Sequence, residues 1–279
     1  GFINLWLDNS MWQSFLKSSL KLDDLIDCNI GNGRSVNVEY VSANPTGPLH
    51  VGHCRGAVFG DVLSNLLQKT GHKVTKEYYI NDAGSQIKNL TNSVFIRYQE
   101  LLGEKFSEYP DDFYPGDYLM PVAQYFVSTH NTKLLEMNDE ERFLLIKPYT
   151  VNFMINLIKE DLAALSINQD IFISEQDLVN EGKIDKAIKA LEKSNLIYEG
   201  VLDPPKGKKP DDWEPRPQML FKSTNYGDEV DRPLQKSNKE WTYFANDIAY
   251  HFDKYKRGST HLIDILGADH GGYVKRMTA

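Results

Sequence analysis

Two histidines, His50 and His53, stand three residues apart in a segment that joins a strand pattern to a helix pattern. Residues three apart lie on one face of a helix, so both imidazoles would leave the first turn in the same direction. The start of a helix also presents unpaired backbone N–H groups and the positive end of the helix dipole, which suit phosphate. Gly52 between them has no side chain to hold a ligand away from the backbone. These residue types at this spacing predict a nucleotide-binding turn.

Two predicted elements position that turn. Residues 36–41 carry apolar side chains along one side, as a strand does. Residues 49–69 place apolar side chains at helical spacing, and Thr70-Gly71 supplies a stop signal. Asn44-Pro45 and Gly47-Pro48 break the chain between strand and helix. The turn is therefore predicted at the carboxyl end of the strand, the edge where ligands bind in open parallel sheets.

The histidine pair has two other interpretations. Two histidines can ligate a metal, but no third ligand is suggested nearby and the HExxH arrangement is missing. One of them could instead only cap the helix, which is a structural role. The longer sequence context described below favours nucleotide binding over both alternatives.

Other periodic segments continue the alternation of strand and helix. Further helices are predicted over 11–26, 83–102, 118–129, 148–165 and 177–194, and further strands over 73–80, 171–173 and 262–266. Asp82 is a candidate N-cap for the helix that follows it. This order predicts an α/β fold with a parallel sheet. Residues 104–116 read as an insertion and 196–239 as a β-rich insertion, in which a basic loop with Lys206, Lys208 and Lys209 is predicted to be solvated rather than bound to RNA.

Composition narrows the class of protein. With 279 residues, 41% hydrophobic and 25% charged, the chain can bury a core. Its net charge of −8 has the wrong sign for nonspecific attraction to nucleic acid, so any RNA contact needs a local basic patch. No run approaches the roughly 18 apolar residues that a membrane span needs. Cys28 and Cys54 suggest neither a zinc site nor a disulfide framework, which favours a cytoplasmic protein with no membrane partner.

The string over residues 38–53, Val-Glu-Tyr-Val-Ser-Ala-Asn-Pro-Thr-Gly-Pro-Leu-His-Val-Gly-His, resembles the HIGH signature of class I aminoacyl-tRNA synthetases, and at this length it looks like that of the arginyl-tRNA synthetase family. Residues 79–84 and 243–251 extend the resemblance, which covers residues 1–276. It implies a Rossmann-type parallel sheet with insertions, the HUP-like nucleotidyltransferase core. The implied reaction activates L-arginine with ATP to arginyl-adenylate and transfers it to the 2′-hydroxyl of the terminal adenosine of tRNA(Arg).

The resemblance also assigns roles to residues. His50 and His53 would be catalytic, and Mg²⁺ would accompany ATP as substrate, with no metal held by the protein. The implied ATP contacts are Pro48, Leu49, His50, Gly52, His53, Gly267 and Asp269. The implied arginine contacts are Glu39, Ser42, Asn44, His53, Tyr243, Asp247 and His270. A guanidinium is planar and always charged, so a site selective for arginine needs carboxylates and other acceptors in a fixed fork. Asn81, Asp82 and Gly84 are expected to border the same cleft.

By this resemblance the chain is a catalytic-core fragment of a monomeric enzyme. The expected divisions are 1–35 as a linker and leading helix, 36–103 as the first half of the core, 104–147 as an insertion, 148–195 as continued core, 196–240 as the β-rich insertion, and 241–279 as the second half of the core. Class I enzymes carry a second, KMSKS-like signature, and nothing resembling it stands before Ala279. The fragment is therefore expected to bind its substrates but to be inactive alone.

Two rival functions stay open from the sequence. One is another HxGH nucleotidyltransferase or a synthetase for a different amino acid. The other is a catalytically silent, synthetase-like binding module. Glu39, Tyr243 and Asp247 discriminate between these functions: if their carboxylates do not converge on one pocket, the sequence no longer favours arginine as the substrate.

Overall fold

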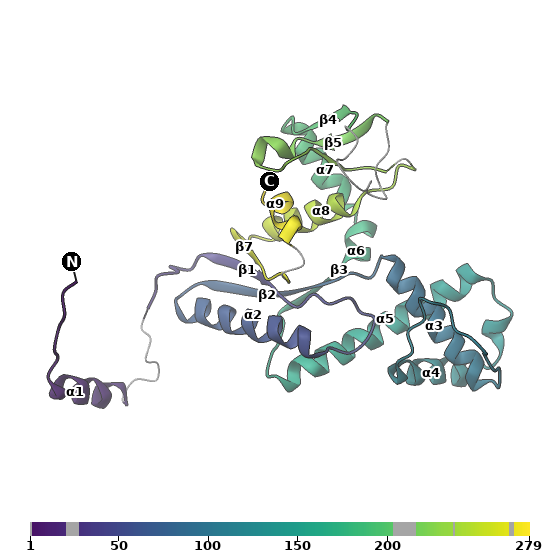
Figure 1. Cartoon of the computed structure of the whole chain (residues 1–279), viewed down its shortest axis with the longest axis horizontal. Coiled ribbons are helices and arrows are strands. Elements are labelled where there is room, and N and C mark those ends of the chain that lie inside the picture. The colour runs from purple at the N-terminus through teal and green to yellow at the C-terminus, as the bar shows by residue number, and fades with distance from the viewer. Residues whose placement is uncertain (1, 21–27, 203–215, 237, 268–270) are drawn as a thin grey trace.

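The computed structural model describes residues 2–20, 28–202, 216–236, 238–267 and 271–279. Its centre is a four-stranded parallel sheet in the order β3-β2-β1-β7 (Figure 1). The strands are β1 Ser35–Glu39, β2 Lys73–Ile80, β3 Ile171–Ser174 and β7 His261–Asp264. Neighbouring strands pair in parallel throughout. The predicted α/β fold with a parallel sheet is therefore confirmed.

The helix α2, Val51–Lys69, lies along one face of the sheet (Figure 1). It packs so closely on β1 that a Cβ atom at Gly60 would lie 2.2 Å from Cγ of Tyr40. Val36, Val38 and Tyr40 are buried beneath it, as their shared face predicted. Asn37 on the opposite face is also buried, where its Nδ2 donates to Oε2 of Glu77 at 2.5 Å.

A helical insertion forms a second core beside the sheet. It contains α3 Ser85–Leu101, α4 Met120–His130 and the first half of α5 Asp139–Ala164, with the 3-10 turns Asp117–Leu119 and Lys133–Leu135. In place of the helix predicted over 148–165, α5 begins at Asp139 and continues through Pro148. Its side chains Ile146 and Met154 belong to the helical core, whereas Ile158 and Leu162 belong to the sheet core. One helix therefore connects the two cores.

A third unit follows β3. It contains α6 Glu175–Asn180, α7 Lys183–Lys193, α8 Tyr243–Lys256, α9 Gly271–Thr278 and the 3-10 turn Ser223–Tyr226. A three-stranded antiparallel sheet, β4 Ile197–Gly200, β5 Gln218–Phe221 and β6 Arg232–Pro233, packs on α7 and α8. The predicted β-rich insertion is present, while its basic loop with Lys206, Lys208 and Lys209 lies outside the described residues.

Three predictions about helix bounds need correction. The helix predicted over 11–26 is described as α1, Asn9–Ser19, which has no buried residue and stands apart from the sheet (Figure 1). The helix predicted over 177–194 is divided into α6 and α7, because Gly182 has a φ of +63°. Asp82 does not cap α3; its carboxylate instead accepts hydrogen bonds from Ser174 Oγ and the backbone N–H of Gln176. None of the described helices is long and apolar enough to cross a membrane.

Candidate active site

Side chains from three other elements hold the loop between β1 and α2 in place. Tyr78 donates from its hydroxyl to the carbonyl of Ala43 at 2.7 Å, and Tyr118 donates to the carbonyl of Thr46 at 2.9 Å. The N–H of Leu49 donates to Oδ2 of Asp161 at 2.8 Å. The loop is therefore fixed from β2, the helical insertion and α5 before it reaches the two histidines.

His50 is the N-cap of α2, and its Nδ1 accepts from the N–H of Gly52 at 3.1 Å. Nδ1 of His53 accepts in turn from the N–H of His50 at 3.3 Å, and the two rings stack with centroids 3.8 Å apart. Burial, followed by the neighbouring His50, lowers the pKa of His53. Because Nδ1 accepts in both rings, the neutral imidazoles carry their protons on Nε2. The capping role considered from the sequence is confirmed, and it leaves both Nε2–H groups available as donors.

The histidines line one open cleft of about 470 Å³, which we call the nucleotide cleft after the role predicted for it from the sequence. Its wall includes the predicted residues Asn44, Pro48, Leu49, His50 and His53, together with Thr46, Gly47, Gln86, Tyr114 and Tyr118. Gln86, Tyr114 and Tyr118 come from the helical insertion, and no motif in the sequence pointed to them. At Gly52 a Cβ atom would lie 2.9 Å from the ring of His50, so the glycine makes room for that ring.

The chain leaves β1 through two residues in the left-handed region, Val41 with a φ of +69° and Ser42 with a φ of +41°. This conformation is rare for residues other than glycine, and especially for β-branched ones. It turns the Ser42 hydroxyl back, so that Oγ donates to Oε1 of Glu39 at 2.8 Å and accepts from the N–H of Tyr79 at 3.0 Å. The turn thereby fixes the Glu39 carboxylate at the end of its strand.

Glu39 belongs to a group of alternating charges that joins β1, α8 and β7. Lys254 Nζ lies 2.5 Å from Oε2 of Glu39 and 2.7 Å from Oδ1 of Asp264. His251 bonds through Nε2 to Oδ2 of Asp264 at 2.8 Å and through Nδ1 to the carbonyl of Asp247 at 2.8 Å. Burial is the largest single influence and opposes the charge on this imidazole, but the hydrogen bond to Asp264, the charge of Asp264 and the bond to the Asp247 carbonyl together raise the pKa of His251. Both ring nitrogens face acceptors, so His251 carries two protons.

Glu39, His251 and Asp264 offer ligand atoms within 4.8 Å of one another, a separation that would suit a metal ion. Both carboxylates of this set, Glu39 and Asp264, already bind the ammonium of Lys254, whose side chain is fully buried. The cluster is therefore described as an internal ion-pair network rather than as a metal centre.

Asp247 lies beside this network, and no Lys or Arg of the described residues forms an ion pair with it. Burial raises the pKa of Asp247 to about 6; a hydrogen bond from Tyr273 and the charge of His251 oppose the rise, and the charges of Glu175 and Glu39 add to it. Glu175 is 3% exposed and accepts from Nδ2 of Asn246 at 2.7 Å. Burial also raises the pKa of Glu175. Glu39, Asp247 and Glu175 therefore share one region, which we call the carboxylate group.

The carboxylate group contains two residues predicted from the sequence, Glu39 and Asp247, and one that was missed, Glu175. The signal for Glu175 was its place directly after β3, whose carboxyl end meets the same edge of the sheet as that of β1. Lys254 and His251 were also missed, although they follow Asp247 along the same helix.

The structure separates other predicted arginine contacts from this group. Asn44 lines the nucleotide cleft, where its Nδ2 donates to Oε1 of Gln86 at 2.8 Å. Tyr243 is 62% exposed at the start of α8, with Lys236 Nζ 5.7 Å from its ring centroid. The predicted arginine contact His270 lies outside the described residues. Of the predicted ATP contacts, Gly267 is exposed beyond β7 and Asp269 also lies outside the described residues.

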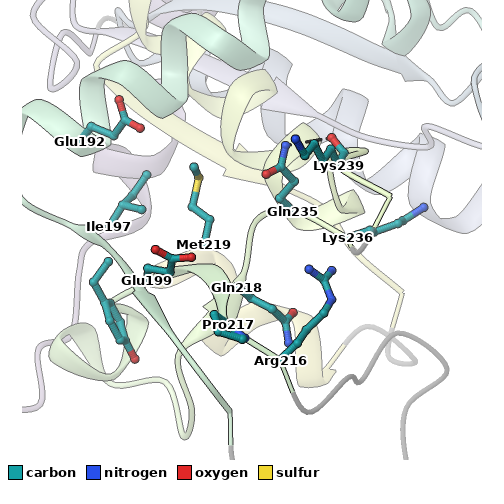
Figure 2. A pocket seen from close by; sticks show the side chains of 11 residues that line it. Glu192, Ile197, Glu199, Arg216, Pro217, Gln218, Met219, Gln235, Lys236 and Lys239 are labelled. Atoms are coloured by element: carbon teal, nitrogen blue, oxygen red, sulfur yellow. Dashed lines mark hydrogen bonds between the residues drawn. The ribbon is translucent and has the colours of Figure 1, made fainter.

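A second hollow, of about 490 Å³, opens in the unit with the antiparallel sheet (Figure 2). Glu192 and Glu199 lie on one side of it, and Arg216, Lys236 and Lys239 on the other (Figure 2). None of the residues predicted to bind ATP or arginine lines it. The nucleotide cleft and the carboxylate group therefore remain the candidate active site.

Comparison with known proteins adds a family. The family described as tRNA synthetases class I (R), catalytic domain, matches residues 16–266. Curated relatives include the arginine--tRNA ligases of Rickettsia prowazekii, 52% identical, and of Ruegeria sp., 53% identical. Each alignment covers 100% of this chain and 48% of the relative, so the chain spans less than half the length of these proteins.

Solved structures agree in fold. An arginyl tRNA synthetase structure from Campylobacter jejuni matches with a TM-score of 0.80 and 32% identity, covering 97% of this chain and 56% of that one. The arginyl-tRNA synthetase from Thermus thermophilus matches with a TM-score of 0.56 and 22% identity, covering 88% of this chain and 39% of that one. The second likeness is one of fold alone.

Proposed function

Since the chain belongs to the family of class I tRNA synthetases (R), catalytic domain, we propose that it carries the catalytic site of an arginine--tRNA ligase. The reaction joins the carboxylate of L-arginine to the α-phosphorus of ATP, releasing pyrophosphate. It then passes the arginyl group to the 2′-hydroxyl of the terminal adenosine of tRNA(Arg), releasing AMP. One observation carries the proposal. The same strand, β1, ends at the carboxylate group and leads directly into the nucleotide cleft.

The nucleotide cleft supplies donors for phosphate. His50 and His53 present Nε2–H groups from the first turn of α2, where the helix dipole is positive. Negative charge increases on the phosphate oxygens when the arginine carboxylate attacks, and fixed donors stabilise that charge without rearranging. Because their Nδ1 atoms are engaged by the backbone, the rings are already oriented before ATP binds. Positioning and charge stabilisation are therefore the main contributions of this turn.

The carboxylate group supplies the counter-charge for a guanidinium. The charges within the network of Glu39, Lys254, Asp264 and His251 balance, whereas no Lys or Arg among the described residues forms an ion pair within 4.0 Å with Asp247 or Glu175. The charge of Lys147 acts on Glu175 without such a contact. A planar guanidinium with five donors matches such acceptors, whereas a lysine ammonium would leave some of them unpaired. We assign Asp247, with Glu39 beside it, to the side chain of arginine.

The remaining assignments follow from this function. ATP would enter as its Mg²⁺ complex, and tRNA(Arg) would be the third substrate. The roles of Ser42, Gly52, Tyr243, Gly267, Asp269 and His270 and the division of the chain at residues 35, 103, 147, 195 and 240 stay predictions. So do a cytoplasmic location and a monomeric state.

Arginine-dependent exchange of pyrophosphate into ATP, in the presence of tRNA(Arg), tests the proposal. It is measured on the chain and on a version lengthened at both ends to match the relatives, with lysine and ornithine as matched alternatives. We expect exchange with arginine only, from the longer version. Exchange with another amino acid would assign a different synthetase, and ATP binding without any exchange in either version would favour a silent binding module.

A further inference from the structure

Lys254 holds a charge in the interior of the site. Its side chain is fully buried on α8, with Nζ 2.5 Å from Glu39, 2.7 Å from Asp264 and 4.4 Å from the ring centroid of Tyr250. These three neighbours come from β1, β7 and α8. The ammonium is therefore enclosed by two carboxylates and one aromatic face.

Stability alone does not account for this arrangement. Removing an ammonium and two carboxylates from water is costly, and their mutual attraction often does no more than offset that cost. Apolar side chains of similar volume are commonly as stable in such positions. We therefore consider how the ion pairs of Lys254 affect the neighbouring carboxylates.

The neighbouring groups are the acids that would receive arginine. Glu39 has one oxygen bonded to Ser42 and the other to Lys254, so both are fixed, while each keeps a lone pair for a ligand. Without the ammonium, His251 would still offset one of the two carboxylates Glu39 and Asp264, but the other would be an uncompensated negative charge beside Asp247 and Glu175. Carboxylates that share a site in this way resist simultaneous ionisation.

We propose that Lys254 is a positioning residue for arginine: its ammonium orients Glu39 and neutralises Asp264, which leaves Asp247 as the acid that pairs with the guanidinium. This inference rests on the arginine-binding function proposed above. Lys254 acts through Glu39 and Asp264 and does not touch the substrate. The nucleotide cleft is formed by other residues, so Lys254 affects arginine binding and leaves ATP binding unchanged.

Calorimetric binding of L-arginine and of ATP to the 279-residue chain tests the inference. Lys254→Met keeps an unbranched side chain of similar length without the charge. We expect it to weaken arginine binding at least tenfold while ATP affinity stays within twofold. Lys183→Met is the matched control, because Lys183 pairs with Asp253 at 2.9 Å outside the carboxylate group. We expect this control to change neither affinity.

A second variant separates positioning from folding. Lys254→Ala leaves space for propylammonium, and arginine affinity that returns as the amine is titrated in supports the proposal. Arginine affinity in folded Lys254→Ala that is equal with and without the amine overturns it, as does native arginine affinity in folded Lys254→Met. If the unchanged chain binds ATP but not arginine, the proposed amino-acid specificity fails first, independently of Lys254.

Discussion

The nucleotide cleft and the carboxylate group lie at the two ends of one short loop, yet they are built in opposite ways. The cleft depends on neighbours in sequence, since His50 and His53 are oriented by backbone N–H groups of their own helix turn. The carboxylate group depends on side chains from β1, α6 and α8, where a hydrogen bond from Asn246 holds Glu175 and an ion pair with Lys254 holds Glu39, both between residues far apart in the chain. The contrast indicates that local bonds position the donors proposed for phosphate, whereas the tertiary fold positions the acids proposed for arginine.

The largest expected effect comes from disrupting the carboxylate group. Glu39→Ala leaves the buried Lys254 ammonium with one carboxylate fewer, and we expect a loss of about 3–5 kcal/mol in the free energy of unfolding. Denaturant titration measures this. Glu229→Ala, which removes an exposed pair with Lys275, is the control and should leave the midpoint unchanged. Equal stability of the two variants would contradict a structural role for the ion pairs.

The contact between α2 and β1 supports both the nucleotide cleft and the carboxylate group. Gly60→Ala places a Cβ atom 2.2 Å from the Tyr40 ring, so we expect overpacking to destabilise the protein by roughly 1–3 kcal/mol. Gly56 on the same helix has no atom within 4 Å of that position, so Gly56→Ala should stabilise the helix by up to about 1 kcal/mol. Thermal unfolding of the two variants measures whether Gly60→Ala lowers the stability and Gly56→Ala raises it.

Acid should weaken the binding of arginine at the carboxylate group. The folded pKa of Asp247, about 6, lies above its ordinary value of 3.8. Its stabilising contribution is therefore fully present below pH 3.8 and lost as pH rises through 6. Arginine binding has the opposite dependence because it needs the ionised carboxylate, so affinity should fall about tenfold from pH 7 to pH 5. Calorimetry at both pH values measures this, and Asp247→Asn should remove the dependence.

The smallest expected effect comes from variants of His50 in the nucleotide cleft, which distinguish helix capping from phosphate binding. His50→Ala removes the N-cap of α2 and should cost about 1 kcal/mol of stability. His50→Asn restores a good cap, so its stability should stay within a few tenths of a kcal/mol of the original. Both lose the Nε2–H donor and should bind ATP more weakly. Native ATP affinity in His50→Asn would show that the imidazole only caps.

The nucleotide cleft and the carboxylate group also differ in how far the sequence predicts them. The strand before the turn, the helix after it and the histidine face follow from patterns within residues 36–69, and the structure confirms them. Glu175 and Lys254 could not be found this way, because a buried charge in a helix shows its meaning only when its partners are known. The break at Gly182 depends on a positive φ, and no periodicity in the sequence indicates that angle.

The continuity of α5 has a mechanical consequence. Pro148 lacks the N–H that would bond to the carbonyl of Leu144, so the hydrogen-bond ladder of the helix has a gap between Ile146 and Met154, which both pack in the helical core. Gln86, Tyr114 and Tyr118 come from the same insertion and form one wall of the nucleotide cleft. Because core side chains flank the proline on both sides, packing rather than the helix ladder keeps that wall rigid.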